Sequence, residues 1–411
     1  MQAAERDPEL VRAHLAEWLA LRLAGAEDGV TVGPLTSPEG LGFSNETHLF
    51  DATWGDGDQR VVRRMVLRIA PTVYQVFLEP RFEEQYQVMV ALTGVDENLP
   101  VPELFGYERD PSVLGAPFFV MGAVDGRAPN DNPPYHVSGW VHDITPADRA
   151  AMWWGGVDTL ARVHRLDPRT LGLGFLDSPR RGRAGIDQQL RYYEEMLDWA
   201  GAKVFDTPPE PLATARDWLR AHQPAEPDPP VLLWGDARIG NILFDDAFRV
   251  AAVLDWEMAE LGAPETDLAW FLFLDRHHSE GCDVPRLDGF PTREQTIARY
   301  EQLLGRPVRD LDYYEVFAAY RFAVIMLRIM VMFVELGMMD PTTDMITNNT
   351  VSRMLATLLG LPAPGGARPP PPAPPPPGGG APGGPPPDRV GTRRPRRAAL
   401  TSEGNGPPDR R

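Results

Sequence analysis

The spacing of apolar residues divides the chain into a part with strand patterns and a later part with helix patterns. Near-helical spacing predicts an amphipathic helix within residues 8–26. Short runs rich in Val, Leu, Thr and Phe, bounded by Gly and Asp turns, predict strands at 30–36, 47–54, 61–70, 103–108 and 117–123, with a helix at 79–94. Helical spacing then dominates at 146–165, 186–200, 209–222, 292–304 and 311–338, with one strand–turn–strand unit at 230–256. This order predicts an α+β fold in which a small β-rich part precedes a larger α-rich part.

The most apolar stretch, residues 316–338, is long enough to cross a membrane. Arg321, Arg328 and Glu335 interrupt it at intervals of seven residues. Seven residues make about two helical turns, so the three side chains form one polar stripe. The pattern therefore favours a helix buried in a bundle, without stable membrane insertion.

The C-terminal region has a different composition from the rest of the chain. Beyond Leu361, Pro and Gly dominate, followed by an Arg-rich end, and such a segment cannot pack a core. A chain of 411 residues suggests about two or three domains. We expect an N-terminal helix, a β-rich nucleotide-binding lobe, an α-rich catalytic and substrate lobe, and a disordered tail, at residues 1–27, 28–124, 125–361 and 362–411.

The charge distribution excludes one large class of partners. The net charge is −18, and the tail contributes +5 to it, so residues 1–361 carry −23. A body this acidic repels phosphate backbones, which argues against nucleic-acid binding. Lys203 is the only lysine, and this arginine bias, together with the Pro and Gly excess, suggests a GC-rich bacterial genome. Cys282 is the only cysteine, which fits a reducing cytoplasm.

The candidate chemistry lies between Val231 and Trp270. An apolar strand enters a turn that carries Asp236, Asn241 follows five residues later, and a second apolar strand ends at Asp255. Magnesium prefers hard oxygen ligands and takes only one or two from the protein when phosphates supply the others. Phosphoryl transfer needs such ligands together with a carboxylate that orients the attacking hydroxyl. The three residues supply these parts.

This segment resembles the catalytic core of the aminoglycoside phosphotransferase family, the small-molecule kinases related to protein kinases. The resemblance implies a bilobal protein-kinase-like fold, ATP as co-substrate and Mg²⁺ as metal. It matches Asp236 to the catalytic aspartate, and Asn241 and Asp255 to the metal ligands. The family usually has His-Gly-Asp where this chain has Trp234-Gly-Asp, a departure at a scaffold position.

The β-rich part resembles the nucleotide-binding lobe of the same family. Residues 40–47 are similar to the hairpin that covers the phosphates, with Gly42, Ser44 and Asn45 as donors or close backbone contacts. Arg68 stands where related kinases have a phosphate-binding lysine. The branch whose kinase-like domains are joined to acyl-CoA dehydrogenases also has arginine there, so we expect Arg68 to bind phosphate.

Four further residues receive expected roles from their positions. Glu84, on the helix after Arg68, is favoured over Glu83 to hold that arginine. Met121 resembles the hinge residue beside adenine. Asp267 resembles a family aspartate that braces the catalytic loop through backbone amides. Glu257 is compatible with either a structural role or contact with metal or substrate.

Together these features predict a phosphotransferase that acts on the hydroxyl of a small molecule. Arg321 and Arg328 favour an anionic acceptor, such as a hydroxy acid or an acyl-CoA-type molecule, whereas the acidic body favours a cationic acceptor such as an aminoglycoside. A nucleotide-binding pseudokinase or a regulatory binding module is the alternative. The sequence identifies no protein partner.

Overall fold

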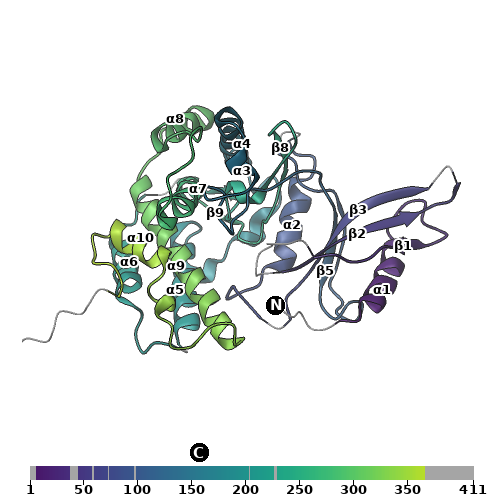
Figure 1. The fold of residues 1–411 in the computed structure, drawn as a ribbon, viewed down its shortest axis with the longest axis horizontal. Coiled ribbons are helices and arrows are strands. Elements are labelled where there is room, and N and C mark those ends of the chain that lie inside the picture. Colours follow the sequence, from purple (N-terminus) through teal and green to yellow (C-terminus); the bar gives the residue numbers. More distant parts are fainter. Residues whose placement is uncertain are drawn as a thin grey trace, which may run out of the picture. The chain divides into compact units, whose positions relative to one another are not determined.

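The computed structural model describes residues 6–37, 45–57, 60–72, 74–96, 99–202, 204–225 and 229–365. Its β-rich part is a five-stranded antiparallel sheet with the strand order β1-β2-β3-β5-β4 (Figure 1). The strands are β1 (Val30–Val32), β2 (Glu46–Trp54), β3 (Val61–Ile69), β4 (Leu104–Glu108) and β5 (Phe118–Gly122). The five strand predictions are therefore confirmed to within a few residues. The tail from residue 366 onward, Gly42, Ser44 and Lys203 lie outside the described residues.

Alternation along the strands gives the sheet two apolar faces, and a helix packs against each. Helix α1 (Pro8–Ala20) covers one face, where the rings of Trp18 and Phe118 lie 5.0 Å apart. Helix α2 (Phe82–Leu92) covers the other, where Phe82 and Phe119 are separated by 5.2 Å. Because adjacent strand residues point to opposite faces, β5 supplies one phenylalanine to each core.

The remaining helices form the α-rich part. They are α3 (Trp140–Asp143), α4 (Pro146–His164), α5 (Ile186–Gly201), α6 (Glu210–Ala221), α7 (Glu265–His278), α8 (Arg293–Leu304), α9 (Leu311–Glu335) and α10 (Thr350–Leu358). Helix α9 packs against α5, α6, α7 and α10. Within the described residues it is the one helix long and apolar enough to cross a membrane, and 78% of that stretch is buried in the protein. The polar stripe predicted this placement.

Two pairs of short antiparallel strands lie in the segment that contains the candidate catalytic residues. Strand β6 (Val231–Leu233) pairs with β9 (Glu260–Gly262), and β7 (Ile242–Phe244) pairs with β8 (Val250–Val253). The backbone N–H of Val253 donates to the Pro100 carbonyl at 2.8 Å, which ties this region to the loop before β4. The two strands expected within 230–256 are β6 and β8, but they pair with β9 and β7 and not with each other.

The sequence analysis did not predict α3, β7, α7, β9 or α10. Helix α7 is buried around most of its circumference, so it has no apolar stripe at helical spacing. Strand β9 has only three residues, which is too short for alternation to show. Helix α10 follows a polar turn and spans nine residues. The omission of α7 matters most, because it carries residues of the site.

Candidate active site

The catalytic loop begins with a backbone turn that only glycine accepts. Gly235 follows β6 with φ of 90°, in the left-handed region. A Cβ at this position would lie 1.9 Å from the carbonyl oxygen of Met258. Any side chain would therefore push apart the loop and the segment after Asp255. The Gly-Asp turn seen in the sequence thus has a steric basis.

Asp236 follows this turn, and its carboxylate accepts hydrogen bonds from three side chains. Trp270 Nε1 donates to Oδ1 at 2.8 Å, Asn241 Nδ2 donates to Oδ2 at 2.7 Å, and Arg238 Nε donates to Oδ2 at 3.1 Å. A carboxylate offers about four lone-pair sites. These bonds use both sites on Oδ2 and one on Oδ1. The remaining site, on Oδ1, is where a hydroxyl proton can be accepted.

The surroundings of Asp236 favour its charged form. Burial is the largest influence and raises the pKa of the carboxyl, but the charge of Arg238 and the hydrogen bonds from the three donors together lower it below the ordinary value. A group that accepts a proton must start deprotonated. The carboxylate is therefore in the form that phosphoryl transfer requires of it.

Arg238 is held in place by a second acid. Its NH1 donates to both Oδ1 and Oδ2 of Asp131, at 2.6 Å each. The loop that carries Asp131 is anchored farther along, where Tyr135 donates to Asp275 of α7 at 2.7 Å and His136 lies 3.0 Å from the same oxygen. A loop from before α3 thus fixes the arginine that contacts the candidate base.

Asp255 has the features of a cation ligand. Its backbone is in the left-handed region, with φ of 62°. Its Oδ1 is buried and has no hydrogen-bond partner among the described residues. Burial is the largest influence and raises the pKa of the carboxyl; Arg68 offsets part of the rise, and the charge of Asp236 adds to it. A buried carboxylate oxygen without a donor is costly unless a cation binds it.

The structure brings Asn241 and Asp255 together. The N–H of Leu254 donates to the Asn241 carbonyl at 2.9 Å, and Ile242 pairs with Val253 across β7 and β8. No group of three or more His, Cys, Asp or Glu residues suited to a metal occurs among the described residues. One carboxylate and one amide oxygen suit Mg²⁺, which takes its other ligands from phosphates and water. The donor set therefore fits the predicted metal.

Asp267 braces the catalytic loop from α7. Its Oδ2 accepts the backbone N–H of Trp234 at 2.7 Å, and its Oδ1 accepts that of Gly235 at 3.1 Å. His164 Nε2 lies 3.1 Å from the same carboxylate, and its other ring nitrogen contacts the Tyr300 hydroxyl. The aspartate thus occupies the position expected of it, supported by a buried histidine.

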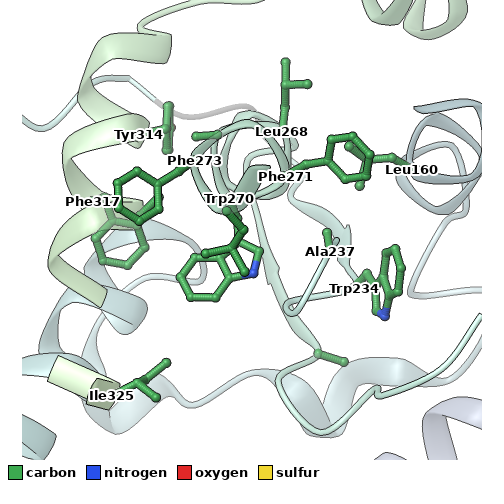
Figure 2. Close-up of a cluster of buried hydrophobic side chains, with 14 of the residues drawn as sticks. Leu160, Trp234, Ala237, Leu268, Trp270, Phe271, Phe273, Tyr314, Phe317 and Ile325 are labelled. Atoms are coloured by element: carbon green, nitrogen blue, oxygen red, sulfur yellow. The ribbon is translucent and has the colours of Figure 1, made fainter. Parts of the chain in front are cut away.

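Trp234 stands where related chains have histidine, and it still links the two halves of the site. Its indole N–H donates to the carbonyl of Leu254, the residue before Asp255, at 2.8 Å. It is fully buried and belongs to the apolar cluster around the loop, together with Trp270 (Figure 2). The substitution keeps a ring donor at this position, so the loop remains tied to the metal-binding segment.

The predicted nucleotide-binding residues occupy three places. Arg68 lies on β3, and its NH2 is 3.7 Å from Asp255 Oδ1. Asn45 donates to Glu257 at 2.8 Å, which joins the base of the predicted phosphate hairpin to the segment after Asp255. Met121 is buried on β5, directly before the chain leaves the sheet.

Glu84 does not occupy the position that was expected of it. It lines a surface groove together with Arg180 and Phe175. Among the described residues, the ion pair that Arg68 makes is with Asp255. The expected ion pair between these two described residues, Glu84 and Arg68, is therefore not formed in this structure.

Both arginines of α9 bind the protein itself. Arg321 donates to the Gly235 carbonyl, and its guanidinium lies 4.0 Å from the ring centroid of Trp270. Arg328 donates to the carbonyl of Gln75 at 2.8 Å and pairs with Glu335 of the same stripe at 2.9 Å. Arg321 therefore braces the catalytic loop and Arg328 braces the segment before α2, which differs from the substrate contact that was expected.

Cavity size does not locate the site. A cavity of about 440 Å³ is lined by α7, the start of α8 and parts of α9 and α10, including Arg276, Arg286 and Arg293. It contains none of the predicted site residues. The site is defined instead by the hydrogen bonds to Asp236 and by the buried Oδ1 of Asp255, which has no hydrogen-bond partner among the described residues.

The sequence analysis missed three residues that shape the site, namely Asp131, Arg238 and Trp270. Arg238 lies two residues after the candidate base, so its position alone was a usable signal. Trp270 is buried like a core residue, but its indole N–H donates a hydrogen bond to Asp236. Nothing in the sequence around Asp131 indicated its contact.

We expect Trp270→Phe to lower kcat about tenfold with little change in nucleotide affinity, because it removes one hydrogen bond to a charged group that orients Asp236. The measurement is steady-state kinetics beside equilibrium nucleotide binding. Trp153→Phe is the matched control, since Trp153 is equally buried and donates to Thr296 at 2.9 Å, away from the site. Equal kcat in the two variants would contradict a role for the Trp270 N–H.

Comparison with known proteins agrees with this geometry. The model of the phosphotransferase enzyme family (APH) matches residues 40–302, which is more than half of the chain. The chain therefore belongs to the phosphotransferase enzyme family (APH).

Individual similar proteins fall into two groups. A Ralstonia eutropha protein assigned to the aminoglycoside phosphotransferases has a crystal structure with TM-score 0.62 and 26% identity, covering 86% of this chain and 97% of that one. Probable acyl-CoA dehydrogenase IBR3 of Arabidopsis thaliana is 29% identical over 70% of this chain and 35% of its own. Acyl-CoA dehydrogenase family member 11 of Gallus gallus is 34% identical over 46% of this chain and 22% of its own. The chain thus spans about a third or less of the length of these curated relatives.

Proposed function

We propose that this protein is an ATP- and magnesium-dependent kinase that phosphorylates the hydroxyl of a small molecule. The observation that carries the proposal is that Asp236, Asn241 and Asp255 lie in one segment and that the buried Oδ1 of Asp255 has no hydrogen-bond donor among the described residues. Arg68 lies 3.7 Å from that oxygen, beyond hydrogen-bond distance, so its lone pairs remain available to a metal ion. The bound magnesium would supply positive charge to the terminal phosphates.

Asp236 acts as the base in this proposal. Its orientation is fixed by three donors, so the open lone pair on Oδ1 has one direction. A hydroxyl that donates to this position has its oxygen directed at the phosphate, and its proton passes to the carboxylate as the new P–O bond forms. The bond to the leaving ADP oxygen breaks at the same phosphorus. Positioning and charge stabilisation then provide most of the rate acceleration.

Arg68 is proposed to bind the phosphates of ATP. Its Nε is buried and has no hydrogen-bond partner among the described residues, so a donor is available. Gly42, Ser44 and Asn45 would cover the phosphates from the hairpin, and the chain around Met121 would receive adenine. A guanidinium can donate two parallel bonds to a phosphate, which suits this position.

For the acceptor we propose an anionic hydroxylated molecule of the hydroxy-acid or acyl-CoA type. Support comes from the acyl-CoA dehydrogenase names of the curated relatives. The arginines of α9 no longer support it, because both bind the protein. The acidic body favours the alternative, a cationic acceptor such as an aminoglycoside. Cys282 is the only cysteine, which fits a reducing cytoplasm as the place of the activity.

The test is a two-step assay on the full chain. Thermal shift with ATP or GTP, each with Mg²⁺ or with EDTA, should show stabilisation by a magnesium nucleotide, because a ligand that binds the native state raises its stability. ADP release is then measured over hydroxy acids, their acyl-CoA forms and aminoglycosides. We expect turnover with an anionic acceptor. Binding without any turnover would indicate a pseudokinase, and no binding would overturn the proposal.

A further inference from the structure

We infer that Gln85 of α2 is the residue that holds Arg68 when nucleotide and metal are bound. The inference rests on the proposed function, since it concerns the same phosphate site. A neutral amide would then hold the Arg68 guanidinium, a role that was expected of the acid Glu84.

Arg68 points to the face of the sheet that α2 covers. Along β3, Leu67 and Ile69 are buried in the core shared with α1, so Arg68 between them faces the opposite side. Its partner across β3 and β5 is Phe119, which belongs to the core shared with α2. Arg68 and Phe119 are therefore neighbours beneath α2.

The contacts of α2 show which of its sides faces β3. Tyr86 lies 5.5 Å from Tyr107 of β4, and Glu83 pairs with Arg109 just beyond β4. The side of α2 that carries Tyr86 and Glu83 therefore faces β4. In the sheet order β3-β5-β4, the other side faces β3 (Figure 1).

Gln85 lies on this other side of α2. At 100° per residue, Gln85 is rotated by about 60° from Phe82 in the direction opposite to Tyr86. Phe82 and Tyr86 both stack on Phe119, at 5.2 and 5.7 Å, so the rotation directs Gln85 from Phe119 towards β3. Glu84 projects from the far side of the helix, which agrees with its place in the groove beside Arg180.

Two complementary atoms are left without partners in this place. Gln85 is 3% exposed, and its Oε1, an acceptor, has no hydrogen-bond partner in the described part of the chain. Arg68 Nε, a donor, is likewise buried and unpaired there. A buried polar group without a partner is destabilising. A hydrogen bond from Arg68 Nε to Gln85 Oε1 would satisfy both groups.

There is a chemical reason for Arg68 to change partner from Asp255 to Gln85. In this structure the Arg68 guanidinium lies 3.7 Å from Asp255, the residue proposed to bind magnesium. When a divalent cation takes that carboxylate, Arg68 loses its acidic partner and turns to the phosphates. An amide at position 85 orients the guanidinium without neutralising it, so its full charge remains for the triphosphate. A carboxylate would share that charge.

The experiment measures affinity for Mg-ATP and for ATP in EDTA by calorimetry on the full chain. Gln85→Met keeps the volume and removes the amide, and we expect Mg-ATP affinity to fall about tenfold. Gln85→Glu retains an acceptor and should bind Mg-ATP within about threefold of the native protein. Glu84→Gln is the neighbouring control and should leave affinity unchanged. In an Arg68→Met background, Gln85→Met should have no further effect.

The outcomes separate this inference from the proposed function. If the native chain binds no magnesium nucleotide, the proposed function fails first. If it binds and Gln85→Met matches it, or if Gln85→Met and Arg68→Met add independently, Gln85 does not hold Arg68. If Glu84→Gln lost Mg-ATP affinity instead, Glu84 would be the residue that holds Arg68, as the sequence analysis expected. Thermal unfolding of each variant without nucleotide shows whether a loss of binding reflects a loss of folding.

Discussion

Asp236→Asn is expected to lower kcat by about 10²–10⁴-fold, while affinity for Mg-ATP changes by less than about threefold. In the proposed reaction the carboxylate orients the acceptor hydroxyl and takes its proton on Oδ1, the oxygen that accepts one hydrogen bond, from Trp270. An amide of the same shape has no comparable basicity. Asp236 is directed at the acceptor, whereas Asn241 and Asp255 supply the proposed metal ligands, so nucleotide binding should survive. Steady-state kinetics and calorimetry on the same preparation give both values.

A neighbouring acid provides the control for this experiment. Asp245 lies in the turn between β7 and β8 and pairs with Arg249 at 2.8 Å, exposed to solvent. Asp245→Asn removes a carboxylate from the same segment without touching the site, and its kcat should remain within about twofold of native. A value of kcat for Asp236→Asn within threefold of native would show that another group accepts the proton.

The pattern of apolar residues was sufficient for most of the fold because most elements have one buried face. Strands β2 and β3 alternate, and α4 and α5 carry stripes, so periodicity revealed them. Helix α7 lacks this contrast because it is packed from several sides. Its identification needs tertiary information, since nothing in a fully buried helix distinguishes one side from another.

The residues of the site also fall into those that the sequence revealed and those that it did not. Residues that define the chemistry, such as Asp236 and Asp255, lie close together in one segment of the sequence, each after a short apolar strand, so the sequence revealed them together. Residues that hold the base come from distant segments: Asp131 is more than 100 residues from Arg238, and Trp270 lies on the unpredicted helix. Such contacts depend on how the chain folds back, which spacing along one segment does not encode.

The Arg68–Asp255 pair was also beyond the sequence, and it sets the expected behaviour of a metal-site variant. We expect Asp255→Asn to abolish the magnesium dependence of nucleotide binding. Native protein should bind ATP at least about tenfold more tightly with Mg²⁺ than with EDTA, and the variant should show less than about a twofold difference. Metal-free ATP should bind the variant as well as or better than it binds native protein, because a carboxylate beside the phosphates is gone and Arg68 is released.

Asparagine is the suitable replacement because it tolerates the left-handed backbone of Asp255 at φ of 62° and keeps the side-chain shape. Asp283→Asn is the control, since Asp283 is another aspartate with positive φ, 55°, on the surface away from the site. Thermal unfolding without metal shows whether the variant is folded, since the substitution also removes the ion-pair partner of Arg68. Magnesium dependence that persisted in a folded Asp255→Asn protein would place the metal on other ligands, because the one remaining predicted ligand, Asn241, carries no charge to hold it.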